Sequence, residues 1–330
     1  MIFIHEAGHF VTARICGVGI NEFAIGMGPK VYSKVSAKSN TRYSVRLFPI
    51  GGFVSMVGED EDSNEDNAFG KITVYKRMLI IIAGALMNIL LGFLIMLIIV
   101  STSQSQFATN KVGRFEENAI SSQCGLRIDD VIVKVGRVNI HTGYELAYEI
   151  MNQGFEPIDL TVIRNGEKVV LYDVIFSTFT QSGATFGNVD FASYGEEKTV
   201  VSVLKNAWFR SISTIKMVWD SLVDLVTGRY GMNAVSGPVG ITKELGDAAR
   251  SGIQSLLYLC AVISINLGVV NLLPIPALDG GRFVFLLYEA FFRKPIKKEI
   301  EAYIHFIGIV LLFTLMIVIA FKDIWSIFIR

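Results

Sequence analysis

The sequence predicts a polytopic α-helical membrane protein with a mixed α/β domain inserted between its spans. Hydrophobic residues make up 52% of the 330 residues, and the mean hydropathy is +0.48. These values are too high for an ordinary soluble domain and indicate several membrane spans. Short strands and turns occupy the middle of the chain, between long apolar runs. We expect about four spans, the first of them incomplete.

Charge and cysteine content exclude some classes of protein. The formal net charge is zero, with 30 basic and 30 acidic residues, and no basic stripe is present. The composition therefore gives no reason to expect a nucleic-acid partner. The three cysteines are scattered and form neither a C-x-x-C pair nor a disulfide framework.

Residues 1–16 carry the motif H-E-A-G-H, from His5 to His9, in apolar surroundings. On a helix, residues four apart share a face, so both imidazoles can bind one metal ion. Glu6 can then act on water at that metal as a general base. A chance match is the alternative for so short a motif. A span needs about 20 apolar residues, so we expect this helix to be a truncated first span or one that only dips into the membrane.

Residues 17–77 are expected to form a β-rich region on the cytoplasmic side. The stretch 41–47 alternates, with Tyr43, Val45 and Leu47 as its apolar set, which is the period of a half-buried strand. Residues 78–101 form the second span, and basic residues just before it place this end in the cytoplasm. Within it, Gly84 and Asn88 lie one helical turn apart. This pair indicates either close helix packing with one interhelical hydrogen bond or a direct role in the active site.

Residues 107–190 are expected to form a small mixed domain outside the cytoplasm. Three short strands, a helix near 143–151 and a hairpin turn at Asn165-Gly166 are predicted there. Residues 198–228 form an amphipathic helix with Gly228 at its C-terminal cap. Such a helix lies on the membrane surface or packs on the spans.

Residues 253–281 form the third span, and its end is broken. The segment Asn271–Arg282 holds two prolines and two glycines, which cannot stay in a regular helix. Non-helical backbone at membrane depth is tolerated where it lines a polar cavity or is buried in protein. Asp279 is a costly carboxylate there and needs a partner. Residues 303–321 form the last span, with His305 expected at the membrane interface.

The two ends of the chain together predict a metal site. Catalytic zinc sites commonly use three protein ligands and one water. His5 and His9 supply two ligands. The first helix and the span ending at Asn271 both run toward the cytoplasm, and Asp279 is the lone carboxylate in the broken segment. We therefore expect zinc bound by two histidines and Asp279, with Glu6 as the base.

Several blocks of sequence carry a resemblance to one family. They are H-E-x-G-H at residues 5–9, Glu22–Lys30, P-x-G-G-x-V at Pro49–Val54, Ala83–Asn88, S-G-P-V-G-I at Ser236–Ile241, and N-x-x-P-x-P-x-L-D-G-G-R at Asn271–Arg282. The chain resembles the site-2 protease family of intramembrane zinc metalloproteases, in its bacterial regulator-of-sigma-factor branch. It departs from the family at Ala85, where proline is usual, and at Asp129, where glycine is usual.

The resemblance implies roles for particular residues. Asp279 is the implied third zinc ligand, Glu6 the catalytic acid/base, and Asn271 a contact to the bound substrate. Residues Pro49–Val54 correspond to a membrane-dipping β-loop, and residues 107–190 to a single extracytoplasmic PDZ domain. A strand edge in that loop can hold an extended substrate. The further substrate contacts that we expect are Gly51, Gly52, Phe53 and Asn88.

The expected function is hydrolysis of peptide bonds inside the membrane. By resemblance, the substrates are transmembrane proteins already trimmed outside, such as anti-sigma factors and remnant signal peptides, and a peptide C-terminus is a candidate ligand of the PDZ domain. The expected surroundings are the lipids of the bacterial inner or plasma membrane. The alternatives are a metal transporter, a PDZ-bearing scaffold and an inactive truncated protease. A transporter needs neither Glu6 between the histidines nor the L-D-G-G segment.

Overall fold

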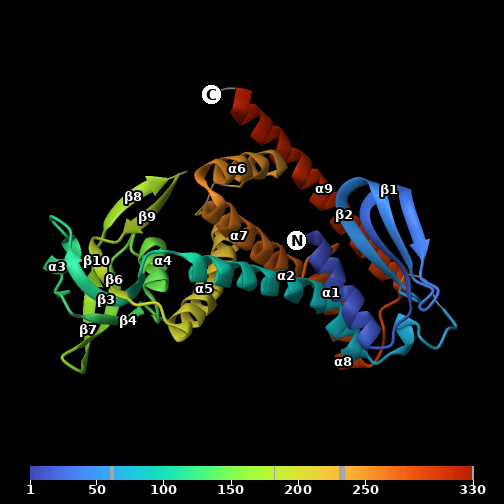
Figure 1. Ribbon diagram of the computed structural model, residues 1–330, viewed down its shortest axis with the longest axis horizontal. Helices are drawn as coiled ribbons and strands as arrows, with labels where there is room; N and C mark the ends of the chain where they lie inside the picture. Colours follow the sequence, from blue (N-terminus) through green and yellow to red (C-terminus); the bar gives the residue numbers. More distant parts are fainter. Residues whose placement is uncertain (60–62, 182, 230–234, 329–330) are drawn as a thin grey trace. The chain divides into compact units, whose positions relative to one another are not determined.

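The computed structural model describes residues 1–59, 63–181, 183–229 and 235–328 (Figure 1). They form two compact units, the first made of Met1–Gly92, Gly237–Lys243 and Leu259–Arg330, and the second of Phe93–Ser236 and Glu244–Tyr258. The helices are α1 (Ile2–Ile15), η1 (Phe69–Lys71), α2 (Val74–Thr102), α3 (Ile120–Gln123), α4 (Gly143–Gln153), α5 (Val200–Thr227), α6 (Pro238–Ser251), α7 (Ile253–Asn271), α8 (Asp279–Phe292) and α9 (Lys298–Phe328). The strands are β1 (Ile20–Val35), β2 (Arg42–Met56), β3 (Phe107–Phe115), β4 (Val131–Val135), β5 (Val138–Asn139), β6 (Ile158–Arg164), β7 (Glu167–Val174), β8 (Ser177–Gln181), β9 (Ala184–Asn188) and β10 (Phe191–Glu196).

Three helices of the described chain, α2, α7 and α9, are long and apolar enough to cross a membrane. A membrane-spanning helix needs about 20 apolar residues, and α1 has 14 residues. The protein is therefore a membrane protein. Whether α1 contributes to a fourth span stays a prediction.

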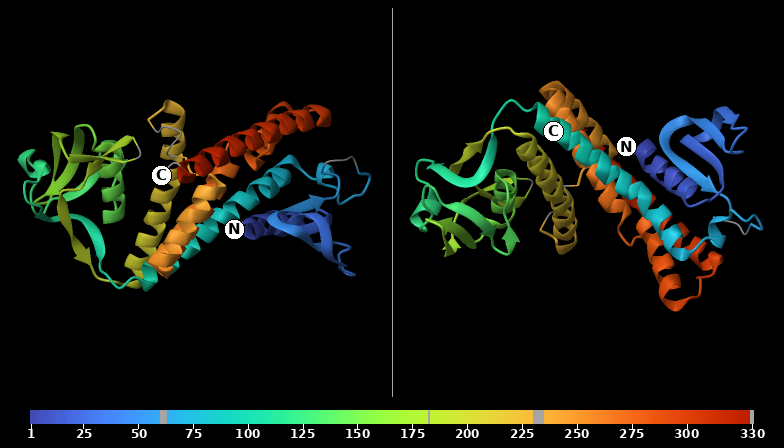
Figure 2. Two further views of the ribbon diagram at one scale, coloured as in Figure 1. Left: turned by 90° about the horizontal axis from the view of Figure 1, so that it is seen from above. Right: turned by 60° about the horizontal axis from the view of Figure 1, so that its bottom comes forward.

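The first unit contains a small antiparallel sheet made by β1 and β2, each of which is bent. Residues 20–25 of β1 pair with residues 52–56 of β2 on one side and with residues 42–45 on the other, while residues 30–35 pair with 42–46. The segment 52–56 therefore lies at one edge of the sheet. Helix α1 lies against this sheet (Figures 1 and 2).

The alternating segment of β2 exposes its apolar residues. Tyr43, Val45 and Leu47 are 40%, 46% and 55% exposed, while Ser44 between them is buried and binds the carboxylate of Glu22 through its hydroxyl group. A sheet in contact with lipid can expose apolar side chains and keep its polar side chains inside, paired with one another.

The second unit contains a sheet of order β10-β3-β4-β6-β7, with β5 paired to β4, and all of its adjacent strands are antiparallel. The predicted hairpin turn is confirmed: Asn165 and Gly166, between β6 and β7, have φ of 52° and 87°, as a type I′ turn requires. Thr142 caps α4 in a reciprocal pair of hydrogen bonds with Glu145. Buried residues from β3, β4, β6 and α4 form the core.

Asp129, in the place where glycine is usual, adopts a left-handed conformation with φ of 73°. Aspartate tolerates this region better than most residues. The backbone N–H of Asp129 donates to the Val112 carbonyl at 2.9 Å, and its carboxylate lies 2.6 Å from the Lys111 ammonium. The turn before β4 therefore forms without glycine.

Helix α6 was not predicted, and it accounts for the S-G-P-V-G-I block. The Oδ2 atom of Asp323 on α9 accepts hydrogen bonds from the N–H groups of Gly237 and Gly240, at 2.8 and 3.0 Å. The first N–H groups of a helix lack partners within the helix. The carboxylate of Asp323 supplies one, and it ties the start of α6 to α9.

Candidate metal centre

Helix α1 presents both histidines on the face that packs against α2. His5 and His9 are 9% and 7% exposed. A Cβ atom at Gly8 would lie 2.6 Å from the Ala83 carbonyl oxygen on α2, so only glycine allows this approach. The small residue of the H-E-x-G-H motif thus brings the two imidazoles close to α2.

Asp279 reaches the histidines because the chain breaks after α7. The backbone turns between Asn271 and Asp279, and α8 begins at Asp279. A Cβ atom at Gly280 would lie 2.1 Å from the Leu273 carbonyl oxygen. Ala277 has φ of 77°, a strained conformation for a residue with a Cβ atom. The structure therefore folds this segment tightly enough to place Asp279 beside α1.

Three ligand atoms converge at this point. The Oδ2 atom of Asp279 lies 3.2 Å from His5 Nε2 and 3.4 Å from His9 Nε2, and the two Nε2 atoms are 3.2 Å apart. Donors bound at about 2.0–2.1 Å in a tetrahedral site are separated by about 3.3 Å. The triangle therefore has the size that a tetrahedral zinc ion requires, and these three residues are the group within the described chain that could hold a metal.

The protonation pattern also fits a cation. His9 Nδ1 lies 2.8 Å from the carbonyl oxygen of Ile80. A carbonyl only accepts, so Nδ1 carries a proton, and in the neutral imidazole Nε2 then keeps its lone pair. This lone pair faces the Asp279 carboxylate, whose buried Oδ2 has no hydrogen-bond partner among the described residues. Facing acceptors repel each other unless a cation lies between them.

Gly84 on α2 makes room for the imidazoles. A Cβ atom at Gly84 would lie 2.3 Å from His9 Nε2 and 2.9 Å from His5 Cε1. Asn88, one turn further along α2, is fully buried and places its amide 3.3 Å from His5 Nδ1. Both residues of α2 that the sequence singled out therefore lie at the centre.

Glu6 lies next to the edge segment of β2. A Cβ atom at Gly52 would lie 3.2 Å from Glu6 Cγ and 2.9 Å from the Ala24 carbonyl oxygen. Gly51 has φ of 82°, and the guanidinium group of Arg46 lies 4.8 Å from the centre of the Phe53 ring. Asn271 is the partly exposed last residue of α7. The structure thus brings Gly52 to Glu6, and Gly51 and Phe53 flank it on the same strand.

His305 has a role that we did not predict. We expected an interfacial side chain, but His305 Nδ1 accepts a hydrogen bond of 2.9 Å from the N–H group of Ala277. A Cβ atom at Gly308, one turn further along α9, would lie 2.6 Å from Pro276. Helix α9 therefore supports the strained segment that carries Asp279. No spacing in the sequence links residues this far apart.

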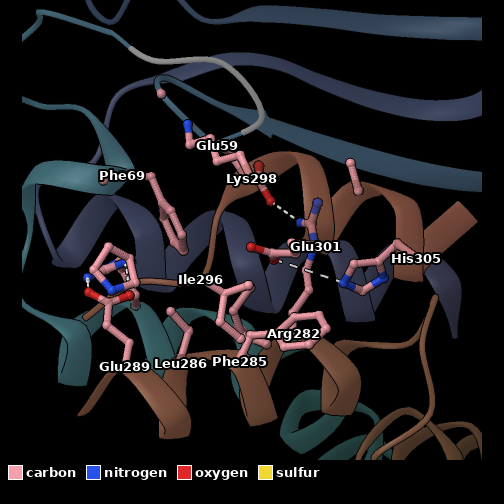
Figure 3. A pocket seen from close by; sticks show the side chains of 16 residues that line it. Glu59, Phe69, Arg282, Phe285, Leu286, Glu289, Ile296, Lys298, Glu301 and His305 are labelled. Carbon is pink, nitrogen blue, oxygen red and sulfur yellow. Dashed lines mark hydrogen bonds and ion pairs between the residues drawn. The ribbon is translucent and has the colours of Figure 1, made fainter. Parts of the chain in front are cut away.

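Ion pairs surround a cavity of about 220 Å³ beside α8. Figure 3 shows Arg282 paired with Glu59 and His305 paired with Glu301. Arg77 on α2 binds Glu289 through two hydrogen bonds of 3.0 and 2.5 Å. The pairs of Arg282 and Arg77 connect α8 to the segment after β2 and to α2, whereas the pair of His305 and Glu301 lies within α9. Arg282 lies in the first turn of α8, which begins at Asp279.

A membrane protein with two histidines and an aspartate converging beside the glutamate of an H-E-x-x-H helix has the features of a metallopeptidase. Comparison with known proteins agrees: the chain belongs to peptidase family M50, the site-2 protease family, whose model matches residues 1–315. It is a zinc metalloprotease.

Relatives cover almost the whole chain. A protein of Clostridium acetobutylicum, whose name describes a zinc metalloprotease, is 37% identical over 328 residues, covering 98% of this chain and 94% of the relative. The zinc metalloprotease RasP of Shouchella clausii is 30% identical, covering 99% and 97%. The regulator of sigma-W protease RasP of Bacillus subtilis is 28% identical, covering 99% and 96%.

Proposed function

We propose that this zinc metalloprotease cleaves transmembrane segments of single-span proteins that have already been trimmed outside the membrane, as in regulated intramembrane proteolysis. Anti-sigma factors and remnant signal peptides are the proposed substrate classes. The observation that carries this proposal is the metal-sized triangle of His5, His9 and Asp279, which lies among apolar helices and beside a strand edge. The name of the Bacillus subtilis relative, a regulator of sigma-W protease, supports the first substrate class.

The proposed roles follow from chemistry and position. His5, His9 and Asp279 hold the zinc ion. When bound, zinc polarises a peptide carbonyl and acidifies a water molecule. Glu6, one residue after a ligand on the same helix, is placed to take a proton from the water that adds to the carbonyl carbon and to give it to the amine nitrogen as the C–N bond breaks. The burial of His5 and His9 shields their ligand atoms from bulk water.

The edge segment of β2 is the proposed substrate cradle. An edge strand offers unpaired N–H and C=O groups to an extended peptide. Residues 52–56 lie at the sheet edge, and Gly52 lies beside Glu6. A substrate strand added there is extended, so its peptide bonds are accessible to attack. Gly51, Gly52 and Phe53 are the proposed contacts of this segment with the substrate, and Asn271 is a further proposed contact.

We also propose roles for the second unit and an orientation of the protein in the membrane. We assign the sheet and helix α4 of the second unit to a single PDZ domain outside the cytoplasm, which binds the C-terminus of the trimmed substrate or excludes untrimmed proteins. Basic residues before α2 and after α8 support a cytoplasmic location for the H-E-x-x-H end. The proposed location is the bacterial cell membrane, with lipid around α2, α7 and α9.

Replacement of Glu6 tests the reaction. Glu6→Gln removes the base and leaves the metal ligands, so cleavage of a model transmembrane substrate should fall by about 10²–10⁴-fold while bound zinc stays at the wild-type level. Asp279→Ala should instead lower the zinc content. Asp247→Ala, at an exposed position on α6, is the control and should change neither. Cleavage that survives in Glu6→Gln would show that the protein is not a protease of this mechanism, as expected for a transporter or a scaffold.

A further inference from the structure

Asn88 is the buried polar side chain of α2 that faces the metal centre. It is 0% exposed, and its Nδ2 atom is placed 3.3 Å from Nδ1 of His5. Its Oδ1 atom is also buried, and no donor among the described residues lies within hydrogen-bonding distance of it. A buried amide oxygen without a partner costs about 1–3 kcal/mol, so this arrangement needs an explanation.

Binding of a metal to Nε2 of His5 determines whether Nδ1 needs a hydrogen-bond donor or an acceptor opposite it. The Nε2 atom of His5 lies in the ligand triangle, 3.2 Å from Asp279 Oδ2. When Nε2 binds a metal, Nδ1 of the neutral imidazole carries the proton and becomes a donor. An amide N–H group opposite it would then place two donors face to face. Rotation of the Asn88 amide by 180° exchanges two groups of the same size and places Oδ1 there as an acceptor.

His9 also has an acceptor on α2 opposite its Nδ1 atom. The Nδ1–H group of His9 donates to the Ile80 carbonyl. Ile80, Gly84 and Asn88 are spaced by four residues and therefore share one face of the helix. Along that face, a backbone carbonyl meets one imidazole, glycine makes room for both, and an amide meets the other imidazole. One stripe of α2 thus contacts both histidines.

The backbone at Asn88 is fixed from the opposite side. The hydroxyl group of Ser264 on α7 donates to the Asn88 carbonyl at 2.8 Å. A Cβ atom at Gly268, one turn further along α7, would lie 2.8 Å from the Ala85 carbonyl oxygen, so the two helices approach closely. Asn88 therefore has little freedom to move away from His5.

We propose that Asn88 is a positioning residue, whose amide oxygen accepts the Nδ1–H of His5 and fixes that imidazole in the tautomer and orientation that bind zinc through Nε2. This inference rests on the proposed zinc site of His5, His9 and Asp279. It assigns Asn88 to the metal centre, in place of the substrate contact expected from the sequence.

The test is zinc binding by the full-length protein, stripped of metal and titrated in competition with a chelator. Asn88→Leu keeps the branched shape and removes the acceptor, and it should weaken zinc binding by about 10–100-fold. Asn88→Asp supplies only acceptors and should bind zinc within about threefold of the wild type or more tightly. Asn206→Leu makes the same exchange at a buried asparagine of α5 in the second unit, whose amide donates to the Ser202 carbonyl, and is the matched control, with unchanged affinity expected.

Cobalt provides a second measurement that reports on geometry. The visible absorption of bound Co²⁺ should change in Asn88→Leu and keep the wild-type shape in Asn88→Asp. If Asn88→Leu does not fold, Asn88→Asp decides, because an amide that acts as a donor to His5 predicts a loss of zinc affinity in that variant. Wild-type zinc affinity in Asn88→Leu, or tenfold weaker binding in Asn88→Asp, would overturn the proposal. These titrations need no turnover, so they remain informative even if Glu6→Gln still cleaves.

Discussion

At the scale of single residues, the geometry of the candidate metal centre depends on glycines, which lack a side chain, as well as on the three candidate ligands. Gly8 and Gly84 have no side chain where one would strike α2 or the imidazoles. Each ligand atom needs a fixed position to within a fraction of an ångström for metal binding. A small residue that allows close approach therefore contributes to the site without touching the metal.

Gly84→Ala should disturb the centre without removing a ligand. The added methyl group would lie 2.3 Å from His9 Nε2, so the imidazoles must move and zinc affinity should fall by about tenfold or more. The zinc content of the purified variant measures this. Gly246→Ala, in α6 with open space around it, is the matched control and should keep full zinc. Full zinc in Gly84→Ala would show that the imidazoles adapt to the methyl group.

At the scale of elements, a buried polar cluster holds the β1–β2 sheet together. The carboxylate of Glu22 accepts hydrogen bonds from Ser44 and Arg46, at 2.6 and 2.8 Å, and lies 2.9 Å from the Lys30 ammonium. Burial alone would raise the pKa of Glu22, but the hydrogen bonds from Ser44, Lys30 and Arg46 outweigh it and lower the pKa to about 2. The cluster fixes the register that places Gly52 beside Glu6.

This cluster predicts a pH dependence. Because the pKa of Glu22 is lower in the folded protein than its ordinary value of 4.5, its contribution is complete at neutral pH and is lost as the pH falls from about 4.5 toward 2. Glu22→Gln should therefore lower the free energy of unfolding by about 1–3 kcal/mol at pH 7. The difference from the wild type should shrink below pH 4.5.

Thermal unfolding in detergent at pH 7, 5 and 3 measures this difference. Glu65→Gln, at an exposed position, should melt like the wild type throughout. A stability difference between Glu22→Gln and the wild type that stays constant across this pH range would contradict the assignment.

At the scale of the whole molecule, the two units differ in what they contain. The first holds the candidate metal centre and most of the apolar helices, and the second holds the larger sheet with its own core. The proposed topology places Ala37, between β1 and β2, in the cytoplasm and Thr180, on β8, outside. Both residues are exposed, so their accessibility can be measured.

Single cysteines at these positions test the topology. In full-length protein with the native cysteines replaced by serine, a membrane-impermeant maleimide should label Thr180→Cys in intact cells. It should label Ala37→Cys only after permeabilisation, because positive charge near a span stays on the cytoplasmic side. Labelling of both after permeabilisation is the control for reactivity. The reverse pattern in intact cells would invert the proposed orientation. The replaced residues are Cys16, Cys124 and Cys260.

Local patterns were sufficient for much of the fold. The apolar runs, the hairpin turn at Asn165-Gly166 and the cap at Gly228 depend on neighbouring residues alone, and the structure contains each of them. The orientation of the alternating β2 segment could not be read in this way. Periodicity shows that two faces differ, but only the surroundings decide which face is buried.

The sequence by itself determined the family, the zinc metalloprotease activity and the three side chains that converge, because the chemistry of zinc limits the choice of ligands. Tertiary structure decided how they are held. The contact of Asn88 with His5, the carbonyl of Ile80 opposite His9 and the support of Ala277 by His305 all join residues from different helices. No local spacing encodes such contacts, because they arise only when close packing brings distant segments of the chain together.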